Sequence, residues 1–281
     1  MTKIAVAIIH GVGAQDSRFA EDMINELRKR FVAHLPKKVT DPSEQIVFEP
    51  VYWAPVLQNA QNRLLRKLKS ADLDYIKLRE FFISFGGDAI AYQPTPQGSQ
   101  VYLAVHKVFA DTLQILAGQT SKDAPLCVIA HSLGTVIASN FLYDLQKNKT
   151  GITHLTTALQ RGETLSHFYT MGSPLAVWAL RYKNFGTPIN VPSNKFLSHH
   201  PKAQSEWVNF YDKDDVIGYP LKKLNDAYKK AVKKDVAVNV GGITTSWNPA
   251  SHVQYWTDND ITKQIAKSLA KAWIALNKQN G

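Results

Sequence analysis

Ser132 lies in a five-residue run, Ala-His-Ser-Leu-Gly, whose residue types predict a nucleophilic serine. An apolar run at 126–130 precedes it, and a helix-like stretch at 135–147 follows it. Where a strand turns this tightly into a helix, the residues two before and two after the serine must be small. Ala130 and Gly134 meet that requirement, although glycine is usual at the first of these positions. The pattern predicts a nucleophile elbow that holds the Ser132 hydroxyl clear of the strands.

A serine hydroxyl is a weak nucleophile near neutral pH, so it needs a base to take its proton and a carboxylate to orient that base. His252 follows the last predicted strand and comes directly before the final predicted helix, which makes it the predicted base. Three aspartates follow an earlier strand. Asp214 is preferred as the acid because it begins an Asp-x-Val-Ile pattern, and Asp212 and Asp215 are the alternatives.

Acyl transfer also requires hydrogen-bond donors for the developing oxyanion. The backbone N–H of Leu133, directly after the nucleophile, is the first predicted donor. The loop after the first predicted strand reads His-Gly-Val-Gly, and its glycines allow the sharp turn that presents an N–H inward. Val12 is the preferred second donor, with Gly11 as the alternative.

These residues must be positioned by a sheet, because apolar β-branched runs alternate with longer helical patterns along the chain. That alternation predicts an α/β fold with a mainly parallel sheet and helices on both faces. The strands are expected at 3–9, 46–52, 126–130, 166–171, 207–211 and 236–240. Between the first two, apolar residues recur every four positions from Phe19 to Phe31, which predicts an amphipathic helix. A last helix is expected at 258–276, with Asp258 as its N-cap.

The 281 residues are expected to form a single α/β domain over 1–281. Two segments fit the sheet pattern poorly. Residues 55–97 have a helical pattern that breaks at glycines and prolines, and residues 174–205 are rich in turn formers. Both are interpreted as inserts that either cap the edge of the sheet, where loops carry specificity, or pack as decoration.

Together these motifs resemble those of the α/β-hydrolase superfamily, and within it serine esterases and lipases with an Ala-His-Ser-x-Gly elbow and a His-Gly-x-Gly first loop. The run Met171 to Pro174 also resembles the Gly-Ser-Pro turn that follows the next strand in many lipases. The resemblance implies an α/β-hydrolase fold in which Ser132 is the nucleophile, Asp214 the acid and His252 the base. It also implies an oxyanion hole formed by Val12 and Leu133. The helical insert before the elbow has no counterpart in the minimal lipases.

The expected activity is hydrolysis of carboxylic esters of acyl or lipid type through an acyl-enzyme on Ser132. A thioesterase, an amidase or an acyltransferase with the same triad remains an alternative, as does an inactive hydrolase fold that serves as a binding module. The chain lacks His-Glu-x-x-His and Cys-x-x-Cys spacings, so neither a metal nor another cofactor is expected.

The net charge of +10 predicts attraction to anionic surfaces. Lysines are densest over 222–234, which is interpreted either as a solvated helix face or as a peripheral contact with anionic membrane lipid. No nucleic-acid-binding motif is found, so nucleic acid is not an expected partner. The sequence shows neither a signal-peptide pattern nor a long apolar span, and its single cysteine, Cys127, lies in a predicted strand. A cytoplasmic location is therefore expected.

Overall fold

The computed structural model describes residues 1–12, 15–69, 86–94, 100–201, 203–240 and 251–278, without the side chains of 68, 69 and 251–253. Within these residues the centre is a parallel sheet with strand order β2-β1-β3-β4-β5-β6. Its strands are β1 (Ile4–Ile9), β2 (Ile46–Val51), β3 (Leu126–His131), β4 (Leu165–Met171), β5 (Glu206–Asp212) and β6 (Lys234–Val238).

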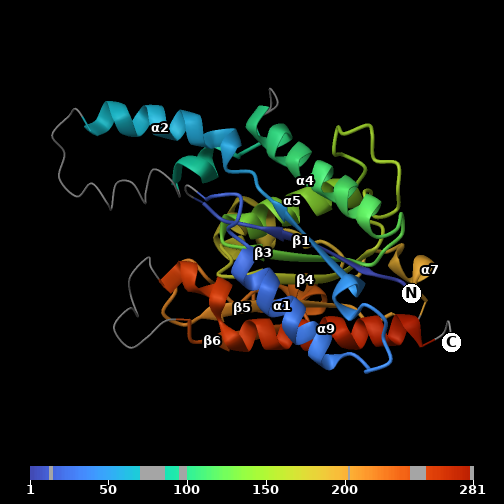
Figure 1. Ribbon diagram of the computed structural model, residues 1–281. Helices are drawn as coiled ribbons and strands as arrows, with labels where there is room; N and C mark the ends of the chain where they lie inside the picture. The colour runs from blue at the N-terminus through green and yellow to red at the C-terminus, as the bar shows by residue number, and fades with distance from the viewer. Residues whose placement is uncertain (13–14, 70–85, 95–99, 202, 241–250, 279–281) are drawn as a thin grey trace.

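Helices cover both faces of this sheet (Figure 1). On one face lie α1 (Glu21–His34) and α9 (Asn259–Asn277), and on the other lie α4 (Gln100–Gln119) and α5 (Leu133–Gln146). Each face has its own apolar cluster, which is why β1, β3 and β4 are buried at every position. The predicted mainly parallel α/β architecture is confirmed.

The two predicted amphipathic helices are present. In α1 the buried residues Met23, Leu27 and Phe31 recur every four positions, as the apolar pattern indicates. The side chain of Asp258 accepts a hydrogen bond from the N–H of Ile261 at 2.9 Å, so it is the N-cap of α9. Both observations confirm the predictions.

Strand β6 begins two residues earlier than predicted, at Lys234, and ends at Val238. Lys234 is in register with Val208 of β5, and Asp212 at the end of β5 is in register with Val238. Val240 instead donates its N–H to the Asp212 carboxylate at 2.7 Å. At Val240 a side-chain acceptor therefore replaces the backbone acceptor that a strand partner would supply, and the strand has ended.

The strand order reverses direction at β1, which is flanked by β2 and β3. The connections after β1 and after β3 leave the sheet at the same edge, beside each other, because Ile9 is in register with Ala130. In open parallel sheets this switch point is where ligands bind. The reversal therefore places the His-Gly loop next to Ser132.

The two predicted inserts differ in placement. Residues 55–97 contain α2 (Pro55–Lys69), which lies on the α4 side of the sheet (Figure 1), and a further helical stretch at 86–91; 70–85 and 95–99 lie outside the described residues. Residues 174–205 begin beside the end of β4 and finish before β5, so they run from one edge of the sheet to the other. They form short turns, namely α6 (Leu175–Trp178), η2 (Ala179–Arg181), η3 (Lys183–Phe185) and α7 (Phe196–His199).

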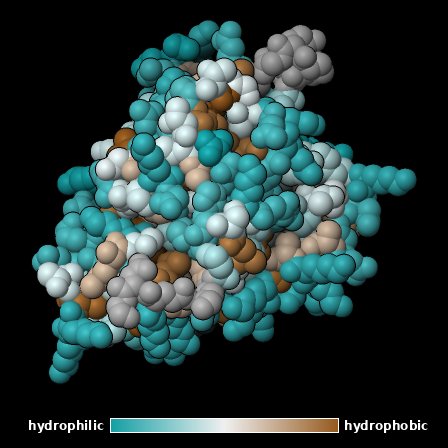
Figure 2. All heavy atoms as spheres, turned by 90° about the vertical axis from the view of Figure 1, so that its right-hand side faces the viewer, coloured by the Kyte–Doolittle hydropathy of each residue, from teal (hydrophilic) through white to brown (hydrophobic). Residues whose placement is uncertain are grey.

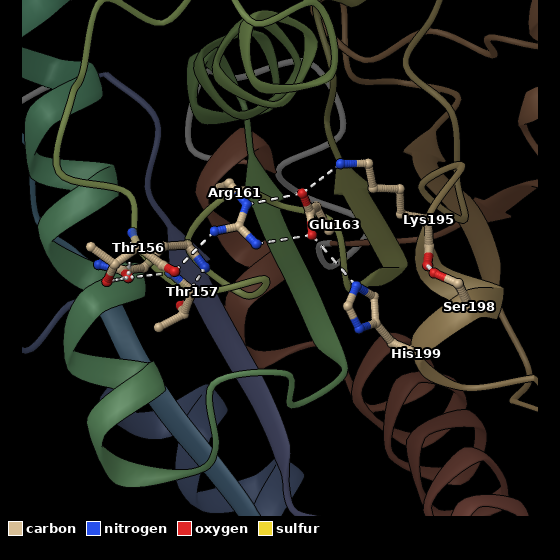
Figure 3. Close-up of polar contacts among 8 residues, drawn as sticks. Thr156, Thr157, Arg161, Glu163, Lys195, Ser198 and His199 are labelled. Atoms are coloured by element: carbon tan, nitrogen blue, oxygen red, sulfur yellow. Dashed lines mark hydrogen bonds and ion pairs between the residues drawn. The ribbon is translucent and has the colours of Figure 1, made fainter.

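A cluster of charged side chains holds the second insert to the chain that enters β4 (Figure 3). Glu163 accepts hydrogen bonds from Arg161 at 2.9 Å and from Lys195 at 2.8 Å, and His199 lies 3.5 Å from its second oxygen. The hydrogen bonds from Arg161 and then from Lys195 lower the pKa of Glu163 to about 2. Because β4 starts at Leu165, this cluster lies at the opposite edge of the sheet from Ser132.

Figure 2 shows the face that carries α7 and both chain termini; hydrophilic side chains predominate there, and hydrophobic ones are scattered. The remaining short elements are η1 (Pro42–Gln45), α8 (Asp226–Ala231) and η4 (Ser251–Thr257). Among the described helices, none combines the length and the apolar character that a membrane crossing requires.

Candidate active site

Ser132 occupies the tight turn between β3 and α5, with φ 53° and ψ −131°. A positive φ is costly for a residue with a Cβ and persists only where the surroundings enforce it. Here the N–H of Ser132 donates to the carbonyl of Met171 at 2.9 Å. The hydroxyl of Thr135 donates to the carbonyl of Ser132 at 2.7 Å. The strand–turn–helix predicted around Ser132 is present, and its backbone is strained at the serine itself.

Two glycines allow the first loop to approach this turn. A Cβ on Gly11 would lie 2.5 Å from the Cβ of Ser132 and 3.0 Å from its Oγ. A Cβ on Gly134 would lie 2.4 Å from the carbonyl oxygen of His10. Both distances are shorter than any side chain tolerates, so the loop and the elbow interlock only because both positions are glycine.

The buried ring of His10 secures the first loop. Its Nε2 accepts hydrogen bonds from the N–H groups of Trp53 (3.2 Å) and Ala54 (3.3 Å), so the ring proton is on Nδ1 and donates to the carbonyl of Gly11 at 2.8 Å. The ring also stacks on Trp53, with centroids 5.0 Å apart. Burial lowers the pKa of His10 to about 4, which keeps the imidazole neutral in this arrangement.

The bond from His10 to the carbonyl of Gly11 orients the next peptide. In a trans peptide the carbonyl and the following N–H point in opposite directions, so the N–H of Val12 is directed away from the His10 ring. Val12 is half-buried, and Gly13 lies outside the described residues. Leu133 is the first residue of α5, where an N–H has no acceptor within the helix. The two predicted oxyanion donors therefore flank the Ser132 turn, on the loop and on the helix.

The three candidate acids differ in exposure. The side chain of Asp214, the preferred acid, is exposed, and those of Asp212 and Asp215 are buried. Both oxygens of Asp212 accept backbone hydrogen bonds, from the N–H of Asp214 at 2.9 Å and from that of Val240 at 2.7 Å. Asp212 thereby ties the turn after β5 to the chain that leaves β6.

Asp215 lies closer to the elbow. A Cβ on Gly218 would contact both the Asp215 carboxylate, at 2.8 Å, and the Cα of Gly172, at 3.2 Å. Gly172 directly follows Met171, whose carbonyl binds the N–H of Ser132. The end of β4 therefore lies between Ser132 and Asp215.

Tyr255 joins the acid loop to η4. Its hydroxyl donates to Asp215 Oδ2 at 2.8 Å and accepts from the N–H of Asp212 at 2.8 Å. Burial, followed by the neighbouring Asp215 carboxylate, raises the pKa of this phenol, so the hydroxyl keeps its proton. Tyr255 and Trp256 also contact the ring of His131, with centroids 5.6 and 5.3 Å apart.

These contacts place η4 between the elbow and the acid loop. His252 belongs to η4, and its side chain lies outside the described residues. Sequence reasoning missed the roles of His10 and Tyr255, although each stands close to a predicted site residue. Within the described residues, no three His, Cys, Asp or Glu side chains gather where they could hold a metal ion.

No family model matches the chain, and no curated protein matches it either. Among solved structures, the chain is similar over its full length to a fungal esterase from Rhizomucor miehei, with 10% identity, a TM-score of 0.43 and 77% of that chain covered. It is also similar over 99% of its length to the phospholipase PlaB from Legionella pneumophila, with 10% identity and a TM-score of 0.32. The chain spans 64% of that phospholipase.

Proposed function

We propose that this protein is a serine hydrolase that cleaves carboxylic esters through an acyl-enzyme on Ser132. The observation that carries the proposal is the strained backbone of Ser132, wedged against the His10–Gly11 loop. Strain of this kind at a non-glycine residue is found where function requires it. A packing role alone gives no reason for a serine at φ 53°.

In the proposed reaction His252 takes the proton from the Ser132 hydroxyl while Oγ forms a bond to the ester carbonyl carbon. The N–H groups of Leu133 and Val12 stabilise the oxyanion. The bond from carbon to the alkoxy oxygen then breaks, and His252 returns the proton to the leaving alcohol. Water repeats the sequence: it forms a bond to the acyl carbon, releases the acid and restores the Ser132 hydroxyl.

We take Asp215, one of the predicted alternatives, as the acid in place of Asp214. A carboxylate orients an imidazole effectively only where water does not screen it, and Asp215 is 6% exposed whereas Asp214 is a surface residue. Asp212 is buried too, but it accepts two backbone N–H groups, those of Asp214 and Val240. Asp215 accepts one backbone N–H, that of Ile217 at 2.9 Å, besides the Tyr255 hydroxyl. Tyr255 links Asp215 to the helical turn that carries His252.

The test is hydrolysis of p-nitrophenyl esters of increasing acyl length, alongside the thioester and the anilide of the same acyl group. The proposal expects the ester to be the preferred substrate and Ser132→Ala to lower kcat by about 10³-fold or more. Ser139→Ala, at a serine within α5, is the matched control and should keep full activity. A preference for the thioester or the anilide would favour the thioesterase or amidase alternative. No turnover of any acyl substrate would favour a binding module.

A further inference from the structure

Five large apolar side chains are exposed on segments at the Ser132 edge of the sheet. They are Leu64 (45% exposed), Ile90 (75%), Val177 (50%), Leu180 (70%) and Val216 (80%). Leu64 belongs to α2, which follows β2, and Val177 and Leu180 follow β4; Val216 follows β5. Single exposed apolar residues are normal on a soluble protein, whereas apolar residues gathered on one surface mark an interaction site.

Hydrogen bonds show that these segments are neighbours. Gln61 of α2 donates to Asp88 in the helical stretch at 86–91. Arg181 of η2 donates to Gln93 at 3.3 Å, and the N–H of Tyr219 donates to the carbonyl of Ser173 at 3.3 Å. We use the word rim for the segments 55–67, 86–94, 174–183 and 213–219. They form one continuous surface along the edge that carries Ser132.

The exposed charges of the rim are mainly positive. The exposed cations are Arg63, Arg66, Lys67, Arg181, Lys183 and Lys213. Of the acidic residues in these segments, Asp88 and Asp215 are buried and Asp214 is exposed. The guanidinium of Arg181 also lies over the rings of Trp178 and Tyr182, at 4.7 and 4.8 Å. Apolar side chains interleaved with cations suit the boundary between acyl chains and anionic headgroups.

The lysine-rich stretch at 222–234, which the sequence singled out for contact with lipid, lies elsewhere. The N–H groups of Leu221 and Lys222 both bind the Asp235 carboxylate at 2.9 Å. Asp235 is in register with Asn209, and Lys234 with Val208, in the first half of β5. The end of this stretch therefore lies at the start of β6, toward the edge opposite Ser132. Its Asn225 side chain donates to the carbonyls of Asn184 and Gly186, at 2.7 and 3.0 Å, just beyond the rim segment 174–183.

We propose that the rim docks this protein onto an anionic lipid bilayer, with the Ser132 edge facing the lipid. Docking in this orientation brings Ser132 to esters that reside in the membrane surface. That consequence rests on the proposed hydrolase function, whereas docking itself requires no catalysis.

The test is co-sedimentation of the full chain with vesicles of phosphatidylcholine, with or without phosphatidylglycerol. Ser132→Ala is used as the background so that the lipids stay intact. The proposal expects binding to the anionic vesicles, and at least tenfold weaker binding of Ile90→Ser/Leu180→Ser. The matched control is Ile115→Ser/Leu197→Ser, which removes two exposed apolar side chains from the end of α4 and from α7, at the opposite edge (Figure 1). The control should bind as the background does.

A charge-reversal pair separates the rim from the lysine-rich stretch. Arg63→Glu/Arg66→Glu on α2 should weaken binding at least tenfold, whereas Lys229→Glu/Lys230→Glu on α8 should weaken it less than threefold. No binding of the background protein, unchanged binding of the rim variants, or a larger loss from the α8 pair would each overturn the proposal. Hydrolysis of p-nitrophenyl acetate by the same variants with Ser132 restored should be unchanged. An absence of that hydrolysis in the wild type would count against the proposed function and not against docking.

Discussion

Gly11 and Ser132 are in such close contact that a Cβ on Gly11 would lie 2.5 Å from the Cβ of Ser132. This contact couples the loop that carries one proposed oxyanion donor to the turn that carries the proposed nucleophile. The loop cannot keep its position beside Ser132 if residue 11 acquires a side chain.

Gly11→Ala should therefore lower kcat on a soluble ester by about 10²-fold or more, the usual effect of losing one oxyanion donor. Gly118→Ala is the matched control, since a Cβ at that position of α4 would meet nothing within 4 Å. That substitution should keep full activity and raise the free energy of unfolding by about 0.5–1 kcal/mol, because glycine disfavours helix. Full activity of Gly11→Ala, measured by steady-state kinetics, would contradict the proposed geometry.

The choice among the three aspartates gives a second prediction. Asp215→Asn should reduce kcat by about 10²- to 10⁴-fold, as expected for a carboxylate that orients the catalytic base. Asp214→Asn should change kcat less than threefold because its side chain is exposed. Asp212→Asn should lower the melting temperature, since an amide has one acceptor oxygen for the two backbone N–H groups, of Asp214 and Val240, that the carboxylate binds. A large loss of kcat in Asp214→Asn alone would restore the acid predicted from the sequence.

Tyr255→Phe should separate positioning from simple stability. The substitution removes one donor to Asp215 and the acceptor for the N–H of Asp212. Leaving such a buried group unpaired costs about 1–3 kcal/mol of stability. If Tyr255 also holds Asp215 in place, kcat should fall about tenfold, while KM stays within twofold. The comparison variant is Tyr219→Phe, whose exposed hydroxyl bonds only to the carbonyl of Val216 among the described contacts. Equal kcat values for the two variants would limit Tyr255 to a structural role.

Because three histidines are buried, we expect the stability of the fold to decrease in acid. Burial lowers the pKa of His10 to about 4, that of His106 to about 3 and that of His167 to about 4. In the unfolded chain a histidine titrates near 6.5. Between about pH 6.5 and pH 4 the unfolded state therefore binds more protons than the folded state, so the free energy of unfolding decreases as the pH falls. For His10 alone this loss is of the order of 3 kcal/mol.

Denaturant unfolding between pH 7.5 and pH 4.5 measures this loss. His106→Phe should make the dependence on pH shallower, because it removes one of the three buried groups. His34→Gln, at an exposed histidine of α1, should leave the slope unchanged. If the free energy of unfolding of the wild-type protein stays constant over this range, the lowered pKa values of the three histidines are contradicted.

The periodicity of apolar residues was sufficient to predict the layers of the fold. The structure confirms three features that depend on local sequence. They are the four-residue spacing of buried side chains in α1, the N-cap at Asp258 and the six strands. The start of β6 was displaced by two residues because its ladder is set by β5 and by the Asp212 side chain, which local pattern does not report.

The geometry of the candidate site depends on residues that are distant in sequence. The motif around Ser132 therefore cannot predict all of it. Asp215 is hydrogen-bonded to Tyr255, which is 40 residues away, and the His10 ring to the N–H of Trp53, which is 43 residues away. The motif around Ser132 predicted the strained turn because the demand for small neighbours is local. Which of three nearby carboxylates is buried is decided only when the strands assemble.

Covalent labelling tests whether Ser132 is the nucleophile. The full chain is treated with a fluorophosphonate, and its intact mass and the labelled peptide are determined by mass spectrometry. One adduct per chain is expected, located on Ser132, and none in Ser132→Ala. Unchanged labelling of Ser139→Ala and slower labelling of Asp215→Asn are also expected. An adduct on another residue, or equal labelling of the wild type and Ser132→Ala, would contradict the assignment of Ser132 as the nucleophile.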